Sequence, residues 1–172
     1  MASIINVDQI KNAAGTSGLT LDSSTGKASF PSGATLPAGS VLQVITEKTN
    51  ANLGTTSTSF VDSNLSCTIT PSSTSSKILC IVSSPSWYVA NNASYITIYR
   101  GSTDLGNSTY GLMRNDNTAS NSAGATNQVL DSPNTTSATE YSVYYRTSNG
   151  DQCYICYSSY GYLTLTVMEI AQ

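Results

Sequence analysis

The sequence predicts an all-β protein: an antiparallel β-sandwich of jelly-roll type preceded by an extended N-terminal arm. Two observations carry this prediction. Only 10% of the 172 residues are charged, so the Glu and Lys that favour exposed helices are scarce, while Thr, Val, Ile and 11 Tyr suit a pleated sheet. From residue 41 onward, runs of roughly four to eight apolar or β-branched residues are bounded by Ser, Asn, Gly and Pro, which is typical of short strands joined by turns.

Residues 1–40 have a different pattern. Their short apolar pulses are separated by glycines, and pulses this sparse cannot bury a core of their own. We therefore predict an anchoring arm over 1–40, with one turn of helix around 7–11, that is ordered against its own domain or another chain. The sandwich domain is predicted over 41–172. The predicted anchoring residues are Ile4, Ile5, Val7, Ile10, Leu19 and Leu21.

The strands of the sandwich follow from the alternation of apolar and polar residues. Tyr141, Val143 and Tyr145 alternate with polar neighbours, and Leu163 and Val167 do the same near the end of the chain, so each strand has one buried and one wet face. Many short strands separated by turn signals favour a jelly-roll sandwich. The predicted strands span 41–49, 59–69, 77–83, 95–100, 128–130, 140–147, 152–157 and 162–170.

One hairpin is predicted in more detail. Two runs of alternating apolar residues flank a short Ser-rich loop, and pairing across it would place Ile69 opposite Ile78 and Cys67 opposite Cys80. The stretch 107–127 is rich in Asn, Ser, Gly and Ala and has no period. We predict a long loop or a pair of loops there, which is where binding tends to occur on a rigid sandwich.

Charge and hydropathy exclude several classes of partner. The net charge is −3, the isoelectric point is near 4.6 and no basic run is present, so binding to nucleic acid or to anionic lipid is not expected. No apolar stretch approaches the ~20 residues that cross a bilayer. The first residues have neither the basic region nor the long apolar region of a signal peptide, so neither membrane insertion nor export is expected.

The side chains that most enzymes use are scarce. The chain has no histidine, which removes the commonest general base, the commonest metal ligand and every Ser-His or Cys-His nucleophile. Two carboxylates suffice for glycoside hydrolysis, but Asp131 and Asp151 lie in ordinary turn sequences. We predict no catalytic residue, no cofactor and no metal. The carboxylates available for such a pair are Asp104, Asp116, Asp131, Glu140, Asp151 and Glu169.

The cysteines give no clear metal motif. Cys153 and Cys156 match a C-x-x-C pattern, but Cys67 and Cys80 lack the paired spacing of a four-ligand zinc site. Residues three apart on a strand also point to opposite faces. We predict four reduced, partly buried cysteines, with a Cys67–Cys80 disulfide and a metal or redox site as the alternatives.

Two aromatic clusters are candidates for contacts outside the core. One follows a Ser-Pro-Ser segment, and the other surrounds Gly161. Their rings either pack in the core or at a subunit interface, or stack on a sugar ring. The residues are Trp87, Tyr88, Tyr157, Tyr160 and Tyr162.

Several segments resemble proteins of tailed-phage particles. Residues 4–17 (IINVDQIKNAAGTS), followed by LTLD over 19–22, are similar to the start of many tail fibres and head fibres. The segments STSF (57–60), ITPSSTSSKIL (69–79), YRGST (99–103), LDSP (130–133) and TLTVMEI (164–170) resemble a recurrent phage fibre domain.

Such domains are similar to the C1q/tumour-necrosis-factor type of jelly roll, so the resemblance implies a homotrimer in the virion, assembled in the host cytoplasm. The chain is short and has no repetitive shaft, which favours a head fibre, a decoration protein or a short tail fibre. We therefore expect a structural protein, not an enzyme, bound to capsid or tail proteins through its arm. The alternative is a receptor-binding tail fibre that contacts host-surface carbohydrate through Trp87, Tyr88 and 107–127.

Overall fold

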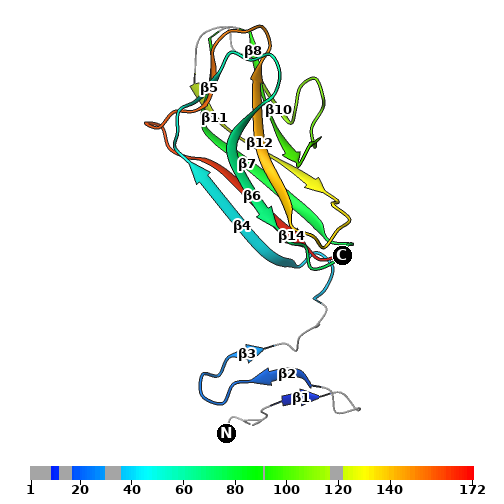
Figure 1. Cartoon of the computed structure of the whole chain (residues 1–172). Coiled ribbons are helices and arrows are strands. Elements are labelled where there is room, and N and C mark those ends of the chain that lie inside the picture. Colours follow the sequence, from blue (N-terminus) through cyan, green and yellow to red (C-terminus); the bar gives the residue numbers. More distant parts are fainter. Residues whose placement is uncertain (1–8, 12–16, 30–35, 91, 117–121) are drawn as a thin grey trace. The chain divides into compact units, whose positions relative to one another are not determined.

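The computed structural model describes residues 9–11, 17–29, 36–90, 92–116 and 122–172, and every regular element within them is a β-strand (Figure 1). These residues therefore contain no helix that is long and apolar enough to cross a membrane. The chain divides into two compact units, Met1–Pro37 and Ala38–Gln172. The prediction of an all-β fold is confirmed.

The first unit contains a small antiparallel sheet with the strand order β1-β2-β3. Asp22 begins the turn between β2 and β3, and its carboxylate accepts the backbone N–H groups of Ser24 and Thr25 at 2.9 and 2.7 Å. The predicted turn of helix around 7–11 is wrong for residues 9–11, which form a paired strand, while 7 and 8 lie outside the described residues. The strands are β1 (Gln9–Lys11), β2 (Ser17–Leu21) and β3 (Ala28–Ser29).

Three of the predicted anchoring residues lie in this sheet. Ile10 on β1 is opposite Leu19 on β2, and Leu21 ends β2. Leu19 and Leu21 are only partly buried, and none of residues 18–27 is buried. The described part of this unit is thus a single sheet layer, and residues 18–27 add no buried side chain to it. The other three anchoring residues, Ile4, Ile5 and Val7, lie outside the described residues.

The second unit is a sandwich of two antiparallel sheets. The first, here called the β7 sheet, has the order β4-β14-β7-β11, and β13 with β5 continues it beside the far end of β7. Its strands are β4 (Val41–Thr49), β5 (Leu53–Thr55), β7 (Lys77–Val89), β11 (Ser122–Asp131), β13 (Cys153–Cys156) and β14 (Leu163–Ile170).

The other sheet, here called the β8 sheet, has the order β6-β12-β8-β10, with the short β9 paired to β8. Each strand is antiparallel to its neighbour. Its strands are β6 (Val61–Ile69), β8 (Ala93–Arg100), β9 (Thr103–Asp104), β10 (Met113–Asp116) and β12 (Thr139–Thr147).

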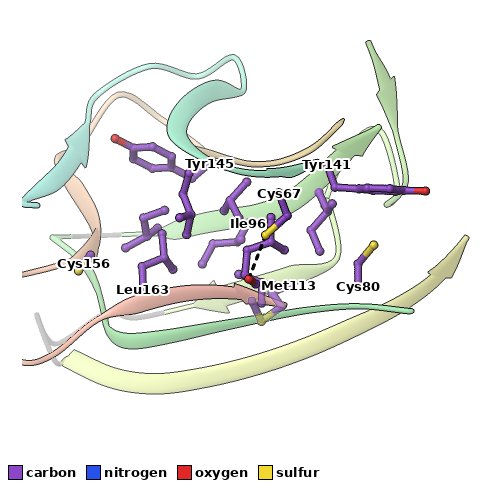
Figure 2. Packing of buried hydrophobic residues seen from close by; sticks show 14 of the residues in the cluster. Cys67, Cys80, Ile96, Met113, Tyr141, Tyr145, Cys156 and Leu163 are labelled. Carbon is purple, nitrogen blue, oxygen red and sulfur yellow. Dashed lines mark hydrogen bonds between the residues drawn. The ribbon is translucent and has the colours of Figure 1, made fainter. Parts of the chain in front are cut away.

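The core fills the space between the two sheets, and alternate residues of each long strand supply it (Figure 2). The alternation predicted for β12 and β14 is confirmed, because Tyr141, Val143, Tyr145, Leu163 and Val167 are all buried. The same holds for the alternating residues of β6 and the first half of β7. Burying large apolar side chains contributes about 1.5–3 kcal/mol each, so these inner faces supply most of the stability.

The hairpin predicted between the second and third strands of the sandwich is wrong. β6 and β7 belong to different sheets: Cys67 pairs with Tyr141 on β12, and Cys80 pairs with Val129 and Val167 in the β7 sheet. The Ser-rich loop therefore crosses from one sheet to the other. Two apolar faces can be buried either side by side or facing each other, and alternation alone does not distinguish these arrangements.

The stretch 107–127, predicted as loop, is partly strand. It contains β10 and the first residues of β11, which pair with β8 and β7. Of the four residues of β10, only Met113 is buried, and the side chains described in the first half of β11 are exposed or half-buried. Mostly exposed strands built from Asn, Ala, Gly and Thr carry little hydrophobic periodicity, which is why the sequence pattern missed them.

The two ends of the sandwich can be defined by the path of the chain. At the end where the chain enters from the first unit, the Gly39 N–H donates to the Ala171 carbonyl at 2.8 Å and the Ala171 N–H donates to the Ser40 carbonyl at 2.9 Å. We call this the linker end. Strand β12 runs from the linker end, where Thr139 pairs with Ile69, to the opposite or distal end, where Thr147 lies.

A buried carboxylate closes the linker end. Glu169 on β14 is completely buried. Its Oε1 accepts the Ser72 N–H at 2.7 Å and the hydroxyls of Ser72 and Ser76 at 2.6 Å each. Its Oε2 accepts the Gln43 side-chain amide at 2.6 Å, and that amide also donates to the Thr70 carbonyl at 2.7 Å. Glu169 thus ties the crossing loop to β4 and β14.

Candidate functional site

Trp87 lies in the core and not on a binding surface. Its side chain is 3% exposed, and its indole N–H donates to the Ser94 hydroxyl at 2.6 Å. The ring therefore offers no open face to a sugar, so its proposed role in glycan contact is wrong. The other interpretation, packing in the core, describes its position.

The predicted tyrosines gather on the β13 side of the β7 sheet. Tyr88 and Tyr157 have ring centroids 6.5 Å apart, and Tyr157 and Tyr160 have theirs 6.0 Å apart. Tyr154, which the sequence pattern did not indicate, stacks on Tyr157 at 4.3 Å and joins the group. Tyr162 stands apart from them, half exposed, with the Lys48 ammonium 4.6 Å from its ring centroid. These tyrosines are half-buried or exposed, so stacking on a sugar ring and packing at a subunit interface both stay predictions.

The carboxylates have structural partners. Asp131 forms an ion pair with Arg100 at 2.7 Å and accepts the Tyr141 hydroxyl at 2.8 Å. Burial, and then the hydrogen bond to Asp131, raise the pKa of Tyr141. The remaining candidate carboxylates are held by neighbouring donors: Asp104 by Thr97, Asp116 by Arg114, Glu140 by Ser142, Asp151 by Asn149, and Glu169 by the loop that it closes.

The four cysteines are free and buried, so the Cys67–Cys80 disulfide does not form. The Cys67 thiol donates to the Leu165 carbonyl at 3.2 Å. The dashed line from Cys67 in Figure 2 marks this hydrogen bond. Cys153 and Cys156 are both buried, contrary to the opposite-face prediction, because the pairing with β5 shifts register between Tyr154 and Cys156. Within the described ranges, no group of three or more Cys, Asp or Glu side chains is arranged to hold a metal ion.

An apolar row crosses the outer face of the β7 sheet. Val44, Met168, Leu79 and Leu130 are register partners on the adjacent strands β4, β14, β7 and β11. Val44 is 52% exposed and Leu130 is 58% exposed, while Leu79 and Met168 are half-buried. We call these four residues the apolar row. Four aligned apolar side chains on an outer face indicate a contact surface more than scattered exposed residues do.

The neighbouring row on the same face is also uncharged. It consists of Thr46, Thr166, Ile81 and Gln128, again register partners across the four strands. The hydroxyls of Thr46 and Thr166 are 2.9 Å apart and satisfy each other. Two successive rows without a charge can meet an identical surface without electrostatic repulsion.

The opposite face of the sandwich carries charges and an open hollow. Phe60 comes just before β6, Tyr99 is on β8 and Arg146 is on β12, so three segments that are distant in sequence meet there. The hollow has a volume of about 550 Å³. It is lined by Thr58, Ser59, Phe60, Tyr99, Ser108, Thr109 and Arg146, and is here called the Arg146 hollow.

Arg146 holds the two walls of this hollow together. Its Nη1 donates to the carbonyls of Thr58 at 3.1 Å and Thr147 at 3.3 Å, and its Nη2 donates to the Thr109 carbonyl. The guanidinium carbon lies 5.2 Å from the centroid of the Phe60 ring and 4.2 Å from that of Tyr95. The guanidinium is therefore fixed in orientation by carbonyls and aromatic rings.

The sequence pattern gave only indirect signals for this site. Arg146 belongs to the predicted wet face of its strand, and Ser108 and Thr109 fall within the predicted loop 107–127. No motif joins them, because they meet only through the strand order of the β8 sheet.

No family model matches the chain, and no curated protein matches it.

Proposed function

We propose that this chain is a structural subunit of a tailed-phage particle: a trimeric fibre or decoration protein that is anchored by its first unit and exposes its sandwich. It acts by binding and assembly, not by catalysis. The apolar row is the observation that carries the assembly part of the proposal. The assignment to a virion rests on the sequence resemblance of residues 4–17 and of the sandwich segments to phage fibre proteins.

The strand order supports a jelly roll of the C1q/tumour-necrosis-factor type. The successive long strands β6, β7 and β8 alternate between the two sheets, and so do β10, β11, β12 and β14. The resulting orders, β4-β14-β7-β11 and β6-β12-β8-β10, are those expected when two Greek keys fold over each other. The number of three subunits comes from the resemblance to that class of domain.

The outer face of the β7 sheet is the surface that fits contact with identical subunits. The apolar row would leave water on assembly, and at about 25 cal/mol per Å² of buried apolar surface a few hundred Å² contribute several kcal/mol per subunit. The adjoining row of Thr46, Thr166, Ile81 and Gln128 presents hydroxyls, a methyl-rich side chain and an amide, without a charge to desolvate. The charged β8 sheet would then face solvent.

The first unit fits an anchor because its described part has a sheet but no second layer. A sheet with one uncovered apolar face needs another surface to pack on, and Leu19 and Leu21 are only partly buried. Several copies anchored together would bind far more tightly than one, since the later contacts become intramolecular.

Light scattering coupled to size-exclusion chromatography tests the assembly. The full chain should give a mass near three subunits at micromolar concentration, and a double substitution of Val44→Lys and Leu130→Lys should give a folded monomer. Both side chains are more than half exposed in the subunit, so the change should cost little within it. The matched control is Thr68→Lys on the outer face of β6, which should remain trimeric. A monomeric wild type, or a trimeric double variant, contradicts this surface.

Deletion of residues 1–37 tests the anchor separately. The shortened protein should stay folded and trimeric but should no longer sediment with particles that lack the wild-type protein. Co-sedimentation equal to that of the full chain would show that the sandwich itself binds the particle.

A further inference from the structure

The Arg146 hollow contains a positive charge without a carboxylate partner. In the described residues the ion pairs are Arg100–Asp131 and Arg114–Asp116, so Arg146 forms none. A guanidinium has five N–H donors, and three hydrogen bonds from Arg146 to carbonyls are found among these residues. Two donors remain for a ligand, which is the number that a bidentate carboxylate takes.

The walls of the hollow supply the other contacts that a sugar ring uses. The Phe60 and Tyr99 rings meet edge to face with centroids 6.3 Å apart, and Tyr144 lies 4.2 Å from Tyr99, so an aromatic group lies beside the guanidinium. Aromatic rings of this kind present an apolar body on which the C–H face of a sugar can lie. Thr58, Ser59, Ser108 and Thr109 line the same space, and Ser and Thr side chains can bind sugar hydroxyls.

The hollow is built before any ligand arrives. The Ser59 N–H donates to the Ser57 hydroxyl at 3.1 Å, which fixes one wall. The Thr109 N–H donates to the Asn107 side-chain oxygen at 2.8 Å, which fixes the other. Arg146 then joins the two walls through their carbonyls. A rigid site loses little conformational entropy on binding, so even a small ligand can be held selectively.

We infer that the Arg146 hollow binds a sugar unit that carries a carboxylate, such as a uronic or sialic acid. The carboxylate accepts two hydrogen bonds from the Arg146 guanidinium, the ring lies against Phe60 and Tyr99, and the wall hydroxyls contact the sugar hydroxyls. The hollow opens on the β8 sheet with Phe60 and Arg146 at the distal end, away from the linker end. Assembly through the β7 sheet leaves it open, and binding here does not require that assembly.

A ligand-observed NMR titration of the full chain tests this directly. The probes are methyl glucuronide and the methyl glycoside of N-acetylneuraminic acid, each compared with methyl glucoside, which lacks a carboxylate. At least one acid should bind about tenfold or more tightly than the neutral glucoside, as expected for a charge-assisted bidentate contact. Equal affinity for all three, or no binding of either acid, overturns the inference.

Variants locate the site. Arg146→Gln should remove the preference for the acid, and Tyr99→Ala should weaken binding several-fold. Because Arg146 also holds the walls, Ser108→Trp gives an independent test. Ser108 is an exposed residue of the lining, so a tryptophan there should fill the hollow without removing Arg146 and should abolish binding. The matched control is Arg114→Gln, an arginine next to Tyr95 and Tyr110 but outside the lining. Retained binding in Ser108→Trp, or an equal loss in Arg114→Gln, refutes the site.

Discussion

Replacing Glu169 by glutamine should destabilise the sandwich far more than the loss of one charge on a protein surface. The side chain is completely buried, and three donors converge on Oε1 while the Gln43 amide binds Oε2. A glutamine at 169 puts an N–H₂ group where Oε2 stood, facing the N–H₂ of Gln43. Turning the Gln43 amide over does not relieve this, because its oxygen would then face the Thr70 carbonyl.

The magnitude follows from the hydrogen bonds. Bonds to a charged group contribute about 1.5–3 kcal/mol each and neutral ones about 0.5–1.5 kcal/mol, so making three bonds neutral loses about 3 kcal/mol. The donor–donor contact with Gln43 adds to this loss, while removal of a buried charge offsets part of it. We expect Glu169→Gln to lower the free energy of unfolding by about 3 kcal/mol and the melting temperature by about 10 °C.

The pH dependence of stability distinguishes the loss of hydrogen bonds to a charged carboxylate from a purely steric effect of the glutamine. Burial alone would raise the pKa of Glu169, but the hydrogen bonds from Ser72, Ser76 and Gln43 outweigh it and hold the pKa below its ordinary value of 4.5. A depressed pKa in the folded state gives stability that is complete above the unfolded pKa and is lost as pH falls through the folded pKa. The free energy of unfolding of wild type should therefore exceed that of Glu169→Gln by a constant amount between about pH 7 and 6, where the carboxyl group is ionised in both the folded and the unfolded state. This excess should become smaller as the pH falls below 4.5.

Urea denaturation at equal protein concentration measures both the loss in the free energy of unfolding and its dependence on pH. Glu47→Gln on β4 is the matched control, because Glu47 is exposed and its replacement should stay within about 0.5 kcal/mol of wild type. A Glu169→Gln protein as stable as the control, or a difference that does not change at low pH, would refute this account of the linker end.

Two further predictions concern the cysteines and a glycine. Burial raises the pKa of the Cys67 and Cys153 thiols from 9.0 to about 11, so a thiol reagent at pH 8 should leave the native protein unlabelled and label all four thiols in urea. Because these folded-state pKa values are raised, their contribution to stability is complete below pH 9 and is lost as pH rises towards 11, which urea titrations across that range would detect. Gly111 has a φ of +66°, and an added Cβ would lie 2.6 Å from the Ile96 carbonyl oxygen. Gly101 has a φ of +54°, but its added Cβ would meet no atom within 4 Å. Gly111→Ala should therefore lower the free energy of unfolding by about 2 kcal/mol more than Gly101→Ala does. Equal stability of these two alanine variants would contradict the steric argument.

The sequence predicts which residues of a strand face the core, but it does not predict which strands lie next to each other. Alternation in 140–147 and 162–170 identified Tyr141, Val143, Leu163 and Val167 as inward residues because burial on one side of a strand leaves a period of two. The same alternation in β6 and β7 suggested a hairpin, although the two strands belong to opposite sheets. Pairing between strands distant in sequence leaves no local mark.

The candidate surfaces show the same limit. Trp87 was a candidate for ligand contact because it is a tryptophan. Its indole N–H instead donates to the buried Ser94 hydroxyl, and the ring packs in the core. Val44, Met168, Leu79 and Leu130 are unremarkable within their own strands and become a row only through register. Phe60, Tyr99 and Arg146 likewise come together only once β6, β12 and β8 are adjacent.

The path by which the chain enters the sandwich also determines how it carries mechanical load. The backbones of residues 39 and 40 are hydrogen-bonded to the backbone of Ala171, so β4 begins beside the end of β14, at the linker end. A pull between the linker and the distal end runs along these strands, while the hydrogen bonds of an antiparallel pair lie across them. The register pairs from Gln43–Glu169 to Thr49–Leu163 are then stressed together in shear and do not open one after another. A domain of this design transmits tension from one end to the other without its strands separating pair by pair.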